Sequence, residues 1–174
     1  MAIKNNSNLV KKRLEKDPKD SELWFKLAYQ YFQEEQHELA IDAYKKGLLI
    51  KSDNPIHWHN LGFLYIEIED YDNAIITLRT ALKLNPNLSI AWTELSSALL
   101  EKGEFQEAIQ SCKKAIELNS RDEVAWTNLG SSYFNMGLYD KAIKSLNTAL
   151  DIVPGLEFAK TILKLTLKAK NQKF

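Results

Sequence analysis

The spacing of the tryptophans constrains the fold of this chain more than any other feature of its sequence. The four tryptophans stand 34 residues apart each time, at Trp24, Trp58, Trp92 and Trp126. Other residue types recur at the same interval, among them Leu27, Leu61, Leu95 and Leu129 and then Ala40, Ala74, Ala108 and Ala142. A fixed period of this length is typical of stacked repeats, in which each repeat buries its apolar face against its neighbours. The sequence therefore predicts four equal repeats with no insertion between them.

Each repeat is predicted to hold two helices. The 174 residues include only six glycines and four prolines, which disfavours a turn-rich β domain. Asp20, Asn54 and Asp122 precede three of the expected first helices, where a short polar side chain can accept a hydrogen bond from a free backbone N–H. The expected helices cover 21–34, 37–50, 55–68, 71–84, 88–101, 105–118, 122–135 and 139–152.

The recurring pattern of tryptophan, leucine, a small residue, tyrosine, alanine and a closing proline resembles the tetratricopeptide repeat. The resemblance covers residues 21–154, with Leu99 in place of a tyrosine and Ser52 and Ser120 in place of prolines. It implies an all-α fold, a right-handed α–α superhelix or solenoid of four 34-residue helix-turn-helix repeats, 21–54, 55–88, 89–122 and 123–156.

The two ends of the chain are expected to cap this array. A stack of repeats exposes the apolar face of its terminal member unless another helix covers it. Residues 1–20 are predicted to form a half-repeat, because Val10, Leu14 and Pro18 fall where the second helix of an earlier repeat would have them. Residues 155–174 carry an apolar stripe beside a lysine stripe, and they are predicted to form a C-terminal capping helix with a basic tail.

Charge and cysteine content disfavour several classes of protein. The 23 Lys and Arg residues balance 23 Asp and Glu residues, so no net charge favours a nucleic acid or an anionic membrane. A single cysteine cannot form an internal disulfide, and no apolar run approaches the roughly 20 residues that span a bilayer. The N-terminus also lacks the apolar stretch of a secretory signal. We therefore expect a cytoplasmic protein that binds neither nucleic acid nor membrane.

A peptide-binding groove is expected on the face of the first helices opposite the tryptophan stripe, because the resemblance implies a concave surface there. The predicted groove residues are Phe25, Lys26, Tyr29, His59, Asn60, Phe63, Thr93, Glu94, Ser97, Thr127, Asn128 and Ser131. The first six are mostly aromatic and the last six mostly small and polar. In the alternative interpretation, some of the aromatic rings pack against neighbouring helices.

Two asparagines occupy equivalent positions in this predicted groove. Asn60 and Asn128 could each offer a donor and an acceptor to an extended peptide backbone, and they could equally be solvated. Their placement is similar to the asparagine ladder in the repeats of the glycosyltransferase that attaches N-acetylglucosamine to serine and threonine. Thr93 is expected to be open enough to accept a leucine at little cost in stability.

The two-carboxylate clamp of chaperone cofactors fits this groove poorly. That clamp needs lysine and asparagine where the chain has Phe25 and Tyr29, and lysine and arginine where it has Ile90 and Glu94. Only Asn60 matches. The carboxylate of Glu94 would also repel an acidic ligand.

Catalytic and metal-binding chemistry finds no support in the sequence. His57 and His59 are two residues apart, so they point about 200° apart on a helix, and Cys112 is expected to be buried. Zinc-ligand spacing, phosphate loops and nucleophile motifs are missing. We predict a scaffold without enzymatic activity, cofactor or metal, which binds a protein or peptide partner. The alternative is a structural protein that assembles with itself through the groove or the terminal helix, and the expected state is a monomer or weak homo-oligomer.

Overall fold

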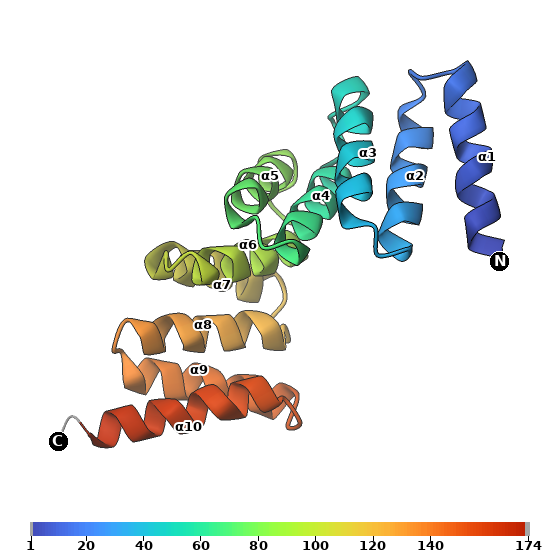
Figure 1. The fold of residues 1–174 in the computed structure, drawn as a ribbon. Helices are drawn as coiled ribbons and strands as arrows, with labels where there is room; N and C mark the ends of the chain where they lie inside the picture. The colour runs from blue at the N-terminus through green and yellow to red at the C-terminus, as the bar shows by residue number, and fades with distance from the viewer. Residues whose placement is uncertain (1, 173–174) are drawn as a thin grey trace. The chain divides into compact units, whose positions relative to one another are not determined.

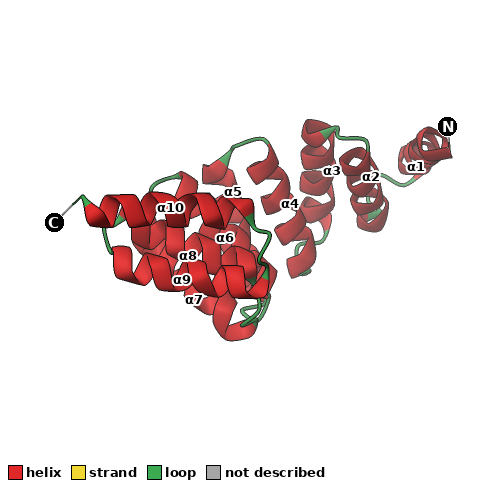
Figure 2. Cartoon of the chain, turned by 90° about the horizontal axis from the view of Figure 1, so that it is seen from below, coloured by secondary structure: helices red, strands yellow, loops and turns green. Residues whose placement is uncertain are grey.

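The computed structural model describes residues 2–172, with side chains from residue 8 onward, and these residues form helices and no strand (Figure 1). The helices are α1 (Ala2–Lys16), α2 (Ser21–Gln33), α3 (His37–Ile50), α4 (Pro55–Glu67), α5 (Tyr71–Leu84), α6 (Ser89–Glu101), α7 (Phe105–Leu118), α8 (Glu123–Asn135), α9 (Tyr139–Ile152) and α10 (Glu157–Asn171). Short loops join them (Figure 2). The predicted all-α fold is confirmed, and the helix ends of the four repeats lie within one residue of those predicted from the sequence.

The chain divides into two compact units, an N-terminal unit of residues 1–85 and a C-terminal unit of residues 86–174. In the N-terminal unit α2 packs on α3 and α4 on α5, while α1 lies against α2 and α3 against α4. In the C-terminal unit α6 packs on α7 and α8 on α9, and α10 packs on α9. The first helices of this unit are also neighbours, because α8 contacts both α6 and α10.

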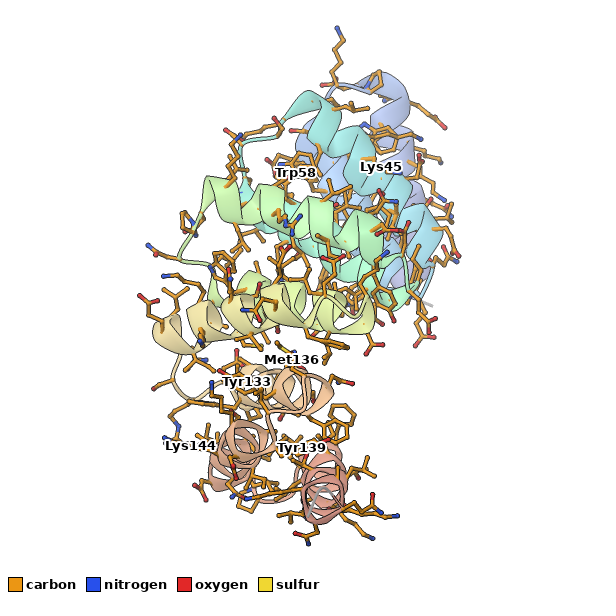
Figure 3. All side chains as sticks on the ribbon, turned by 90° about the vertical axis from the view of Figure 1, so that its left-hand side faces the viewer. Lys45, Trp58, Tyr133, Met136, Tyr139 and Lys144 are labelled. Atoms are coloured by element: carbon orange, nitrogen blue, oxygen red, sulfur yellow. The ribbon has the colours of Figure 1, made fainter. Side chains whose placement is uncertain are left out.

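The repeated tryptophan holds the loop before its helix. Each indole Nε1 donates a hydrogen bond, at 2.7 to 3.0 Å, to the carbonyl oxygen six residues earlier, and the acceptors are Pro18, Ser52, Pro86 and Ser120. Trp58, labelled in Figure 3, makes this bond to Ser52 at 2.7 Å. Serine can replace proline before the helix because the acceptor is a backbone carbonyl, which either residue supplies.

Side-chain caps begin three of the four first helices, as predicted. Carboxylate or amide oxygens of Asp20, Asn54 and Asp122 accept from backbone N–H groups two or three residues later, at distances of 2.8 to 3.1 Å. Helix α6 begins after Leu88, which makes no side-chain cap. Three of the helices that face the predicted groove therefore start at a residue set by a local hydrogen bond.

The turn between the two helices of each repeat requires a left-handed residue at one recurring position. Gly103 and Gly137 have φ angles of 76° and 72° there, and Glu35 and Glu69 adopt nearly the same conformation with φ angles of 56° and 60°. A side chain makes this conformation costly, by roughly 1–2 kcal/mol relative to a right-handed one. The first two repeats therefore carry local backbone strain that the last two avoid.

Small residues lie where the two helices of a repeat cross. The alanines at this position are fully buried, namely Ala40, Ala74, Ala108 and Ala142. Cys112 is buried as predicted, and desolvation raises the pKa of its thiol to about 12. In the C-terminal unit, Ala159 and Ile162 of α10 form one apolar cluster with Leu146 and Ala149 of α9.

Candidate functional site

A small aromatic pocket opens in the N-terminal unit between the first helices of repeats 1 and 2. It has a volume of about 80 Å³, and its lining comes from three helices: Tyr29 and Phe32 of α2, Tyr44 of α3, and Asn60, Phe63 and Leu64 of α4. The structure thus brings together three predicted groove residues, Tyr29, Asn60 and Phe63. We call these six residues the aromatic pocket.

The rings of the aromatic pocket differ in exposure and orientation. The rings of Phe32 and Phe63 meet edge to face, with centroids 5.8 Å apart and planes at 85°, which is a favoured arrangement for two aromatic quadrupoles. Tyr29 is 56% exposed, whereas Tyr44 is buried. A ligand side chain would therefore enter the pocket beside Tyr29, and the rings that would surround it are already in place.

A hydrogen-bonded pair contributes the polar atoms of the pocket. The Nδ2 group of Asn60 donates to the hydroxyl of Tyr44 at 3.1 Å, and the Oδ1 atom lies 3.1 Å from Nδ1 of His59. Burial raises the pKa of the Tyr44 hydroxyl, which therefore stays protonated at neutral pH. The amide of Asn60 is thus bonded within the protein, which differs from both interpretations of the sequence, an amide offered to a peptide backbone and a solvated one.

Phe25 does not line an open groove, and its predicted exposure is wrong. Its side chain is buried, and its ring stacks on the imidazole of His57 with centroids 3.6 Å apart. The ring also lies so close to α3 that a Cβ atom at Gly47 would collide with it. Burial lowers the pKa of His57 in this stack, which keeps the imidazole neutral at pH 7. Among its predicted neighbours, Lys26 is exposed and His59 is half-buried.

In the C-terminal unit, the predicted polar floor is buried. Thr93, Thr127, Asn128 and Ser131 are each at most 7% exposed, and the predicted openness of these four side chains is therefore wrong. Glu94 and Ser97 are half-buried.

The reason for this burial is hydrogen bonding between neighbouring first helices. Thr93 Oγ1 donates to Oδ2 of Asp122 at 2.6 Å, across 29 residues of sequence. Nδ2 of Asn128 donates to the hydroxyls of Ser96 and Ser97 at 3.0 and 2.8 Å. These bonds join α6 to α8 and to Asp122, the residue that caps α8. The polar groups of Thr93 and Asn128 are therefore used in the contact between the two helices.

The predicted groove residues do not include a row of exposed apolar side chains that the structure shows in the C-terminal unit. Ile90, Val124 and Phe158 begin α6, α8 and α10 at intervals of 34 residues, and they are 50%, 44% and 59% exposed. Helix α10 thus continues the pattern of the first helices, although it lacks their tryptophan. The 34-residue interval from Val124 to Phe158 is the signal that could have revealed this row.

The described residues contain no group of three or more His, Cys, Asp and Glu residues able to hold a metal ion. Within the same part of the chain, no helix is both long enough and apolar enough to cross a membrane. The aromatic pocket is lined by four aromatic residues, by Leu64 and by Asn60, whose amide is hydrogen-bonded to Tyr44.

Solved structures of tetratricopeptide repeat proteins resemble this fold. The crystal structure of MamA has a TM-score of 0.83 and 27% sequence identity, with coverage of 86% of this chain and 88% of that one. The structure of YrrB, at 24% identity, covers 94% of this chain and 84% of its own with a TM-score of 0.87. The tetratricopeptide domain of OM64 from Arabidopsis, also at 24% identity, covers 66% of this chain and 94% of its own with a TM-score of 0.64.

The sequence comparisons identify the family. No curated protein matches the sequence. Residues 5–173, nearly the whole chain, match the model of the cilia and flagella-associated protein 70 C-terminal domain. With the 34-residue period and the helical pairs of the structure, this match shows that the chain belongs to the family of the cilia and flagella-associated protein 70 C-terminal domain and is a tetratricopeptide repeat protein.

Proposed function

We propose that this chain is a non-catalytic scaffold that binds a segment of a partner protein, with the aromatic pocket receiving an anchor side chain of that segment. The pocket itself carries the proposal. It is a preformed hollow between two helices, lined by four rings and a hydrogen-bonded Tyr44–Asn60 pair. Concave sites of this kind, mostly apolar with a few placed polar groups, are where proteins hold ligands.

The comparisons with known proteins support protein binding at the level of the fold. The structure of YrrB is described as that of a tetratricopeptide repeat protein with an unusual peptide-binding site. The partner of this chain would be a segment that loses conformational freedom on binding, and that cost limits its affinity. We expect dissociation constants in the micromolar range, equivalent to about 8 kcal/mol.

Affinity capture from the source cell, followed by titration of the captured segment as a labelled peptide, tests this function. Tyr29→Ala removes a side chain that is 56% exposed, so it should weaken binding without unfolding the chain. Phe63→Ala removes a wall of the pocket, and we expect a loss of at least tenfold in affinity. The control is Leu49→Ala, a change on α3 at a side chain that is 87% exposed and outside the aromatic pocket. A partner that binds both pocket variants as tightly as the control would refute the proposed site.

Self-assembly through the terminal helix is the second candidate function. Phe158 and Leu165 of α10 are 59% and 49% exposed, and their spacing of seven residues puts them on one face of the helix. Light scattering over a concentration series, with Phe158→Ser as the variant, separates this function from the first. A mass that stays monomeric at all concentrations excludes assembly.

The cytoplasmic location and the lack of nucleic-acid binding stay predictions.

A further inference from the structure

We propose that the aromatic pocket is a cage for a quaternary ammonium group, and that the anchor of the bound segment is a trimethylated lysine. This inference rests on the proposed function and names the chemistry of the ligand. Four of the six lining residues are aromatic, Tyr29, Phe32, Tyr44 and Phe63. Aromatic faces carry negative partial charge and attract a cation within about 6 Å of the ring centroid.

The arrangement of the rings suits a roughly spherical cation. Phe32 and Phe63 are in edge-to-face contact, with centroids 5.8 Å apart and planes at 85°, so a group in the corner beside them would contact a ring on two sides. Tyr44 is buried among the lining residues, and the exposed Tyr29 lies where the pocket meets solvent. The pocket volume of about 80 Å³ is small beside the roughly 300–1,000 Å³ of pockets that hold drug-sized ligands, which suits a compact head group.

Other aromatic rings of this unit lie beside a lysine of the chain, whereas the four rings of the aromatic pocket do not among the described side chains. In the same unit three lysine ammonium groups lie 4.8 to 5.6 Å from ring centroids: Lys11 over Tyr31, Lys45 over Tyr65, and Lys46 over Trp24. Lys45 is labelled in Figure 3. Among residues 8–172, no lysine or arginine lies over a ring of the aromatic pocket. The cation for this cage would therefore come from the partner.

Desolvation favours a trimethylated over an unmodified lysine. A primary ammonium has three N–H donors, and burying it without acceptors is costly. No carboxylate lines the pocket, and its Asn60 amide is already bonded to Tyr44 and close to His59. A trimethylammonium group has no N–H donor to satisfy and keeps its charge. It therefore gains the attraction of the rings at a smaller cost in lost hydration.

The test is a comparison of two probes of similar shape on the full chain. Tetramethylammonium chloride and the neutral tert-butanol are each titrated against isotope-labelled protein, with sodium chloride matching the ionic strength. We expect tetramethylammonium to shift the aromatic NMR signals of Tyr29, Phe32 and Phe63 with a millimolar dissociation constant, and tert-butanol to bind at least fivefold more weakly. Equal affinities for the two probes would overturn the cage, because an apolar hollow does not distinguish charge.

Two substitutions test whether tetramethylammonium binds in the aromatic pocket. Tyr29→Leu keeps an apolar side chain at an exposed position and should weaken tetramethylammonium binding at least threefold. Phe105→Leu is the matched control, a ring at the start of α7 outside the aromatic pocket whose loss should change nothing. Binding that is unchanged in Tyr29→Leu, or lost equally in both variants, contradicts the assignment.

A second arm separates the failure of this inference from failure of the proposed function. The captured partner segment is synthesised with lysine, with trimethyllysine, and with the neutral carbon isostere of trimethyllysine at its anchor position. We expect the trimethylated form to bind at least tenfold more tightly than the other two. If all three bind equally and Phe63→Ala weakens each, the cage is wrong and the binding site stands. If Phe63→Ala weakens the binding of none of the three peptides, the proposed function is refuted as well.

Discussion

Replacing Asn128 by alanine tests whether the buried polar residues hold α6 and α8 together. Nδ2 of Asn128 donates to the hydroxyls of Ser96 and Ser97, at 3.0 and 2.8 Å, and the side chain is 6% exposed. Each bond contributes about 1 kcal/mol, and both hydroxyls keep their own bond to the carbonyl of Thr93. We therefore expect Asn128→Ala to lower the free energy of unfolding by about 2 kcal/mol.

Urea denaturation followed by circular dichroism measures this loss, and amide hydrogen exchange locates it. In a protein of this length each kcal/mol corresponds to about 2–4 °C in melting temperature, so a fall of about 4–8 °C is expected. Exchange should accelerate first in α6 and α8, because repeat proteins open locally where a neighbour interface weakens.

Ser131→Ala is the matched control for Asn128→Ala. Ser131 is equally buried, yet its hydroxyl donates only to the carbonyl of Thr127 within its own helix, at 3.0 Å. It should cost under about 1 kcal/mol. Combining Asn128→Ala with Ser97→Ala should show a coupling of about 1 kcal/mol. Equal stability of the Asn128 and Ser131 variants would refute a structural role for the amide between the helices.

Four further outcomes follow from the structure. Deleting residues 156–174 uncovers the buried face of α9 and should cost several kcal/mol in a thermal melt, because burial of each large apolar side chain contributes about 1.5–3 kcal/mol. Glu35→Gly and Glu69→Gly should each raise the free energy of unfolding by up to about 1 kcal/mol, since glycine adopts a positive φ without strain. Thr93→Leu should lower the free energy of unfolding by about 2–3 kcal/mol in urea titrations, because it loses the hydrogen bond to the Asp122 carboxylate and overpacks the site. The thiol of Cys112, whose pKa is raised to about 12, should resist iodoacetamide at pH 8 in the native chain and react once urea unfolds it.

Each of these outcomes can fail in a distinct way. A truncated chain that stays monomeric and melts within a few degrees of the full chain would show that α10 covers nothing important. Glycine variants less stable than the parent would mean that the glutamate side chains make a compensating contact. A leucine variant as stable as the parent would restore the open position expected for Thr93. Rapid alkylation of the native thiol would show that the helices around Cys112 open readily.

The number of repeats, the helix boundaries and the tryptophan side of each first helix could be predicted from the sequence alone. The 34-residue interval between tryptophans fixes which residues share a helix face, because a helix turns by a constant angle per residue. Local capping groups such as Asp20 and Asp122 set where first helices begin, and this depends only on residues a few positions away. The positive φ angles of Gly103 and Gly137 are likewise a local matter, because glycine adopts this conformation without strain.

Which residues of the opposite face stay open depends on how the helices pack in three dimensions. Helical spacing gives the direction of a side chain but not the distance to the neighbouring helix, and that distance depends on residues far away in sequence. Gly47 lets α3 approach closely enough to bury Phe25, and the carboxylate of Asp122 draws Thr93 into the joint between α6 and α8. The aromatic pocket likewise needs Tyr44 from a second helix, which no pattern on the first helices could have predicted.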